Sequence, residues 1–146
     1  MKMFRTRPLV AALFALAPLF ASAQAIESAD EILATSLSAL RQIDEGRTDA
    51  IWDQTSAFVK AKMTKDDFVN GIKSARARLG PVASRNWAGV IRIKYLPGSV
   101  EPPPGMYANA DFSSLLKDGR TVFEKVTLRQ EPDGWHLIGY VPRDTQ

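Results

Sequence analysis

The amino-acid sequence predicts an α+β domain with three N-terminal helices packed on a curved four-stranded antiparallel sheet. Before Pro81, apolar residues recur every three or four positions, which is typical of amphipathic helices. After Pro81, they alternate with polar residues at every second position, as in half-buried strands. The two patterns are segregated along the chain rather than interleaved, and this order favours α+β over α/β. We therefore expect one domain, which occupies residues 24–146.

Three helices are expected before Pro81. Ser28 and Glu31 form a capping box that begins the first helix, and Gly46 ends it. A second helix is expected over residues 48–59 and a third over residues 65–79. The stripes that should face the core are Ala29, Ile32, Leu33, Ser36, Leu37, Leu40 and Ile43 in the first helix, Ile51, Trp52, Thr55, Phe58 and Val59 in the second, and Phe68, Val69, Ile72, Ala75 and Leu79 in the third.

Four strands are expected after Pro81, over residues 86–95, 106–113, 121–131 and 135–141. A proline-rich connection joins the first two strands, and Asp-Gly turns join the remaining strands into an antiparallel meander. Helices that cover one face of such a sheet resemble the cystatin-like and nuclear-transport-factor-2-like architectures. A likeness at the level of the fold implies little about function.

The first 23 residues have the pattern of a cleavable secretory signal peptide. Lys2, Arg5 and Arg7 precede a short apolar run, and the segment ends in Ala21-Ser22-Ala23, a typical signal-peptidase site. The apolar run is much shorter than the roughly 20 residues needed to cross a bilayer. We therefore expect cleavage after Ala23, a periplasmic location and no stable membrane anchor in the mature protein.

Charge and cysteine content exclude several classes of function. The chain has 19 Lys and Arg residues against 16 Asp and Glu residues, but three of these basic residues belong to the expected signal peptide. The mature chain is therefore electrically neutral, which argues against binding to nucleic acid. No cysteine is present, so disulfides, thiolate metal sites and a cysteine nucleophile are all excluded.

Glu124 is the most informative candidate residue. In the third strand it shares a face with Val122, Val126 and Leu128, so an inward-facing strand places a carboxylate among apolar side chains. A buried charge needs a partner, and a guanidinium can bind a carboxylate through two hydrogen bonds. The candidate partners at the junction of helices and sheet are Arg76, Arg78 and Arg85. Glu124 is thus either part of a structural ion pair or a cavity carboxylate that acts as a base or anchors a ligand.

A polar stripe on the second strand offers another candidate, Asp111. Tyr107, Asn109, Asp111 and Ser113 alternate with the apolar face of this strand, and simple solvent exposure is the expected explanation. If the stripe lines a pocket instead, Asp111 could transfer protons.

The remaining candidates are aromatic residues and the single histidine. His136 is the only histidine, so neither a catalytic triad nor a histidine-rich zinc site is predicted, and no cofactor or metal is expected. We expect His136 at a surface or half-buried position, on one strand face with Ile138 and Tyr140. Tyr140 is expected in the core, where it could also line the mouth of a pocket. The three tryptophans, Trp52, Trp87 and Trp135, are interpreted as core or core-edge residues.

The sequence resembles the exported bacterial proteins of domain-of-unknown-function family 4019. The stretches that carry the resemblance are Trp52, Arg78-Leu79-Gly80 with Ser84-Arg85, Leu96-Pro97-Gly98 with Gly105-Met106-Tyr107, and Glu124 to Leu128 followed by Asp133-Gly134-Trp135 and Gly139-Tyr140. The resemblance implies export in a Gram-negative bacterium and one compact domain. It implies no activity.

Three functions remain open from the sequence. The preferred one is a non-catalytic exported domain that binds a small apolar molecule between helices and sheet, or binds another envelope protein. The first alternative is a small enzyme without a cofactor that uses Glu124 or Asp111 for proton transfer. The second alternative is a purely structural envelope protein.

Overall fold

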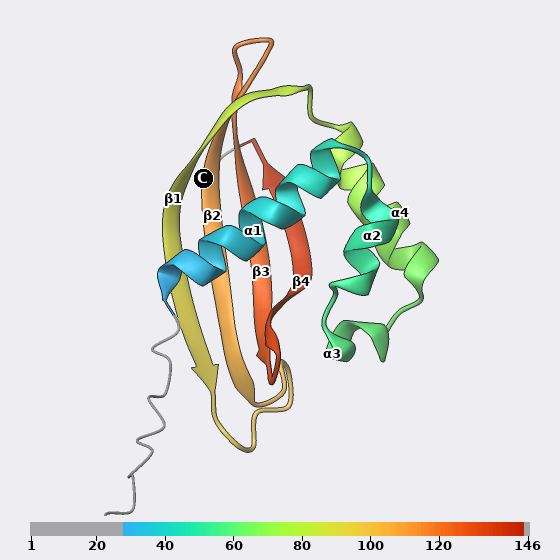
Figure 1. Ribbon diagram of the computed structural model, residues 1–146, viewed down its shortest axis with the longest axis vertical. Helices are drawn as coiled ribbons and strands as arrows, with labels where there is room; N and C mark the ends of the chain where they lie inside the picture. Colours follow the sequence, from blue (N-terminus) through green and yellow to red (C-terminus); the bar gives the residue numbers. More distant parts are fainter. Residues whose placement is uncertain (1–27, 145–146) are drawn as a thin grey trace, which may run out of the picture.

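A four-stranded antiparallel sheet with helices on one face forms the protein, as seen in a computed structural model that describes residues 28–144. The expected signal peptide therefore lies outside the described residues. The strands are β1 (Val82–Tyr95), β2 (Gly105–Leu116), β3 (Thr121–Glu131) and β4 (Gly134–Arg143), and they pair in the order β1-β2-β3-β4. Figure 1 shows the curved sheet behind its helices. The predicted α+β class and the predicted meander are confirmed.

Helix α1 (Ala29–Asp44) lies across the sheet and contacts all four strands (Figure 1). Ser28 is its N-cap and accepts a hydrogen bond from the amide of Glu31, as the capping box predicts. Helix α4 (Lys65–Ala77) begins at the N-cap Thr64 and packs beside β4. The core between helices and sheet contains Ile32, Leu40, Ile43, Ile51, Phe68, Ile72, Ala108, Ala110, Phe112, Val126, Leu128 and Leu137.

The single helix expected over residues 48–59 is instead two short helices, α2 (Thr48–Asp53) and α3 (Ala57–Lys60), so the expected count of three helices is wrong. Thr55 leaves the helical path and forms a parallel bridge with Leu137 at the outer edge of β4. The amide of Ser56 donates to the carbonyl of Leu137, and the amide of Leu137 donates to the carbonyl of Gln54. Pairing with a strand therefore replaces helical hydrogen bonds at this point.

Strand β1 contains a bulge that changes which side chains face the helices. The register shifts between Trp87 and Gly89, so one extra residue reverses the alternation of the strand. Trp87 lies opposite Phe112, whereas Ile91 lies opposite Asn109 on the other face. Because β1 is an edge strand, Trp87 is 63% exposed, and the expectation that it anchors the core is wrong.

Tyr107 also differs from expectation, because it is buried although it lies on the outer face of the sheet. Its hydroxyl donates to the carbonyl of Pro103, and its ring packs edge-on against Tyr95. The proline-rich loop between β1 and β2 therefore covers this residue. The other members of the polar stripe, Asn109, Asp111 and Ser113, are half-buried.

Candidate functional site

Glu124 lies on the helix-facing side of β3 and is 1% exposed. The register places it opposite Phe112 of β2 and Pro142 of β4, so apolar side chains flank it across the sheet. Its carboxylate accepts three hydrogen bonds: from Nε of Arg85 at 2.7 Å, from the Ser114 hydroxyl at 2.5 Å and from the Tyr140 hydroxyl at 2.7 Å. Both carboxylate oxygens are therefore satisfied by protein groups.

Arg85 links this carboxylate to the end of α1. Its Nη1 lies 2.9 Å from Oδ2 of Asp44, the last residue of that helix. Burial alone lowers the pKa of Arg85, but its hydrogen bonds to Asp44 and Glu124, together with their negative charges, raise the pKa above its ordinary value. Arg85 is therefore a permanent cation between two carboxylates.

Arg76 and Arg78 take different positions around this cluster. Arg76, in the last turn of α4, lies 3.1 Å from Oδ1 of Asp44 and joins the cluster through that residue. Arg78 is exposed and lines a shallow surface depression with Leu79, Arg120 and Arg143. Of the three candidate arginines, only Arg85 contacts Glu124.

Tyr140 is the second buried partner of Glu124. Its ring belongs to the core, and its hydroxyl points to the carboxylate. Burial, followed by the negative charge of Glu124, raises the pKa of Tyr140 well above its ordinary value, so the hydroxyl stays protonated. We name the set Asp44, Arg76, Arg85, Ser114, Glu124 and Tyr140 the buried polar cluster. Its members come from α1, α4 and all four strands, so the cluster joins these two helices to the whole width of the sheet.

Asp44 and Ser114 were not identified from the sequence. Asp44 follows the apolar stripe of α1, where an acidic residue normally contacts solvent, and no sequence signal indicates that two arginines converge there. Ser114 could have been found, because the alternation of β2 places it on the same face as Phe112.

Asp111 lies on the opposite, outer face of the sheet. It lines a shallow depression of about 170 Å³ together with Gly89, Phe123, Lys125 and Arg143. Oδ1 of Asp111 lies 3.7 Å from Nζ of Lys125 and 3.3 Å from Nη2 of Arg143. Asp111 is thus a half-buried, ion-paired carboxylate.

A groove between α1 and β4 lies on the helix side of the sheet. It has a volume of about 250 Å³. Its apolar wall consists of Ala39, Ile51, Trp135 and Leu137, and its polar residues are Thr35, Asp53, Gln54, Asp133 and His136. A second depression, which shares Thr35, Asp133 and Trp135, extends it towards Glu31 at the start of α1. We name these two connected depressions the α1–β4 groove.

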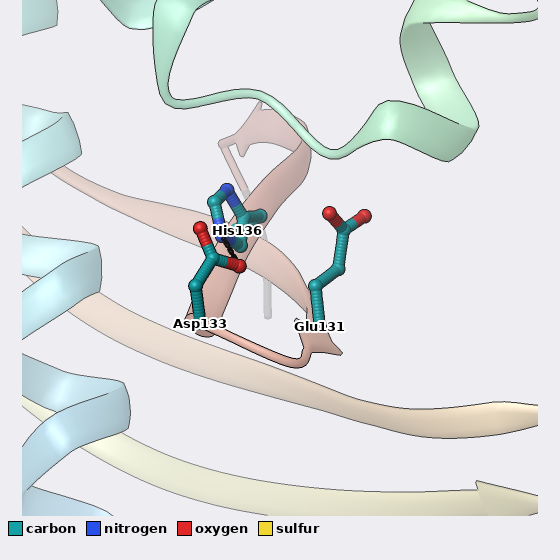
Figure 2. Close-up of side chains that lie close together, drawn as sticks. All are labelled: Glu131, Asp133 and His136. Atoms are coloured by element: carbon teal, nitrogen blue, oxygen red, sulfur yellow. Dashed lines mark hydrogen bonds and ion pairs between the residues drawn. The ribbon is translucent and has the colours of Figure 1, made fainter.

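The polar end of this groove is the turn between β3 and β4. Figure 2 shows Glu131, Asp133 and His136 projecting from this hairpin. Nε2 of His136 lies 2.8 Å from Oδ1 of Asp133, and Nδ1 lies 3.3 Å from the carbonyl oxygen of Gln54. His136 is half-buried, as expected, but a bulge at Ile138 places it opposite Arg129 and not on the face of Tyr140.

Comparisons with known proteins identify the family of this chain. No curated protein and no solved structure matches the chain. Among the described residues, no helix is long and apolar enough to cross a membrane. One family model, described as "Protein of unknown function (DUF4019)", matches residues 35–140, which include the buried polar cluster and most of the groove. The resemblance inferred from the sequence is confirmed, and the chain belongs to this family.

Proposed function

We propose that the protein is an exported, non-catalytic domain that binds a small molecule with an apolar body in the α1–β4 groove. The observation that carries the proposal is the composition of this groove: an apolar wall with Trp135 and Leu137, and polar groups gathered at one end. Binding sites for small molecules are concave and mostly apolar, with a few polar groups that fix orientation.

The state of Glu124 supports a non-catalytic role. Its two oxygens accept hydrogen bonds from Arg85, Ser114 and Tyr140, and it is not among the residues that line the groove. A general base must reach the proton that it removes, either directly or through one water molecule. The buried polar cluster therefore supports the fold, in agreement with the structural alternative for this residue, while the groove provides the binding site.

Location and architecture are part of the same proposal. The pattern of residues 1–23 favours export and a periplasmic location. We further propose that the helices and curved sheet correspond to a cystatin-like or nuclear-transport-factor-2-like architecture, in which cavities form between these two layers.

A protein of the envelope is the second candidate ligand. Strand β1 lies at the edge of the sheet, and its Trp87 and Ile91 are 63% and 56% exposed. An exposed edge strand offers backbone hydrogen-bonding groups to a strand of another protein.

Native mass spectrometry of the protein purified from its own envelope tests both candidates. We expect an added mass of a few hundred daltons, as for a drug-sized molecule, whereas a protein partner adds the mass of a second chain. Thr35→Phe fills the groove from α1 and should abolish the small added mass. Ser38→Phe introduces the same ring on an exposed part of α1 outside the groove and should retain it. A wild-type spectrum that contains only the bare chain, with a melting temperature that envelope extract does not raise, would show the proposal to be wrong.

A further inference from the structure

The β3–β4 hairpin brings together three side chains that can ligate a metal ion. One ligand atom from each of Glu131, Asp133 and His136 lies within 4.8 Å of the other two. Glu131 ends β3, Asp133 lies in the turn and His136 follows in β4, so a single hairpin supplies all three (Figure 2). We propose that these residues bind a divalent transition-metal ion, with Zn²⁺ as its representative, at the polar end of the α1–β4 groove.

The contacts of His136 point to a ligand on Nε2. The carbonyl oxygen of Gln54 lies 3.3 Å from Nδ1 and accepts a hydrogen bond from the tautomer that carries its proton on Nδ1. Nε2 faces a carboxylate oxygen of Asp133 at 2.8 Å, and a carboxylate is also only an acceptor. In that tautomer the lone pair of Nε2 is directed at the Asp133 carboxylate, and a cation shared between the two atoms would bind both. Metal-bound histidines typically donate their other ring N–H to a carbonyl in this way.

Glu131 has the support from neighbouring groups that a ligating carboxylate needs. Its Oε1 accepts a hydrogen bond from the Ser56 hydroxyl and another from the amide of Ala57 at 3.0 Å. These contacts come from the segment that pairs with β4, so they hold the carboxylate in place from outside the hairpin. Hydrogen bonds of this kind orient the carboxylates in metal sites.

The donor set selects the class of metal. One imidazole nitrogen and two carboxylates suit Zn²⁺ and related transition metals, whereas Mg²⁺ and Ca²⁺ prefer sites made only of oxygen. Ligand atoms at 2.0–2.1 Å around a tetrahedral Zn²⁺ are about 3.3 Å apart. Nε2 of His136 and Oδ1 of Asp133, which lie 2.8 Å apart, must therefore separate slightly while the Glu131 carboxylate approaches them. The side chain of Asp133 is 75% exposed and is free to move. Arg129, 3.6 Å from Oε1 of Glu131, offsets part of the negative charge and should limit the affinity.

The single histidine makes the test specific. Zn²⁺ is added to the full chain, without a histidine tag, while ring nitrogen and carbon resonances of His136 are recorded by NMR. We expect a saturable shift of these resonances and a rise in melting temperature, because binding to the folded state stabilises it. Mg²⁺ at the same concentration should produce neither effect.

Two variants locate the site. Asp133→Asn should weaken Zn²⁺ binding by at least about tenfold, since even supporting residues of metal sites contribute that much. Asp118→Asn alters an exposed aspartate in the β2–β3 turn and should leave binding unchanged. Resonances of His136 that do not move with Zn²⁺, an equal affinity in Asp133→Asn, or Mg²⁺ binding as strong as that of Zn²⁺ would each overturn the proposal.

The metal site and the small-molecule site can fail separately. Thr35→Phe fills the groove but changes none of the three proposed ligands, so it should keep the response of His136 to Zn²⁺. Asp133→Asn should lose that response. Loss of carried small molecule in Thr35→Phe with intact Zn²⁺ binding would support both proposals, and a bare wild-type chain that still binds Zn²⁺ would leave only the metal site standing.

Discussion

The hydroxyl of Tyr140 donates a hydrogen bond of 2.7 Å to Oε1 of Glu124 inside the core. Tyr140 belongs to β4 and Glu124 to the neighbouring β3, so this bond joins two strands through their side chains on the helix-facing side. The other oxygen of Glu124 faces Arg85 and Ser114. Each group of the buried polar cluster thus depends on the others for its partners. Three predictions follow from these contacts, and two more concern α3 and the N-terminal sequence.

Glu124→Gln should lower the melting temperature without changing any bound molecule. The substitution removes the negative charge beside Arg85 and leaves an amide N–H₂ facing hydrogen-bond donors, which should cost about 1–3 kcal/mol of unfolding free energy. Urea denaturation measures the loss, with Glu101→Gln, an exposed glutamate, as the control. Unchanged stability together with loss of a bound molecule would instead assign Glu124 to the binding site.

Arg85→Lys should destabilise the protein by about 1–3 kcal/mol, because a buried partner loses its hydrogen bonds. The guanidinium bridges Glu124 and Asp44 with separate nitrogens, and an ammonium lacks this planar geometry. Arg78→Lys is the matched control, since Arg78 is exposed and should change stability by less than about 0.5 kcal/mol. Equal effects of the two substitutions would mean that the bridge contributes nothing specific.

Stability should fall as pH rises above about 10. The unfolded chain loses the Tyr140 proton near the ordinary pKa of 10.0, whereas the raised pKa keeps the proton on the folded protein to higher pH. The unfolded state then binds fewer protons, so the free energy of unfolding decreases with pH. Urea denaturation between pH 9 and pH 11 measures this slope. Tyr140→Phe should flatten it and Tyr95→Phe should not; identical slopes in the two variants would contradict the prediction.

Ser56→Ala should loosen α3. The hydroxyl accepts a hydrogen bond from the amide of Phe58 as N-cap and donates one to Glu131. Loss of an N-cap costs about 1 kcal/mol, so amide hydrogen exchange over residues 57–60 should become faster. Ser74→Ala, at an exposed position in α4, should leave exchange in α3 unchanged.

The N-terminus gives a separate prediction about export. N-terminal sequencing of the protein from an envelope extract should begin at Gln24, because the Ala21-Ser22-Ala23 site lies directly before it. A chain from that fraction that retains Met1 would contradict the signal peptide.

The sequence predicts the parts of this fold that depend on local periodicity. The change of period at Pro81 separates helices from strands because each structure repeats its side-chain directions at its own interval. The same alternation places Glu124 with Val122 and Val126 on the inner face of β3, where the structure has it. No tertiary information is needed for these assignments.

The parts that were not predicted depend on contacts between distant segments. Thr55 breaks an otherwise helical stretch because Leu137, far along the chain, offers a backbone partner. Bulges at Ala88 and Ile138 reverse strand alternation, so Ile91 and His136 lie on faces that a regular pattern does not assign to them. The groove likewise combines residues of α1 with residues of β4, and no local pattern marks such a combination.

The short pairing of Thr55 with Leu137 also limits how copies of the protein could join through their sheets. The bridge pairs the middle of the edge strand β4 with the protein's own backbone, and β1 is the edge strand on the other side of the sheet. A sheet with two free edge strands can add further copies at both edges, as in fibrils. A sheet with one free edge strand can pair only with the same strand of another copy. Pairing between the β1 edges of two copies would therefore give a closed, symmetric dimer.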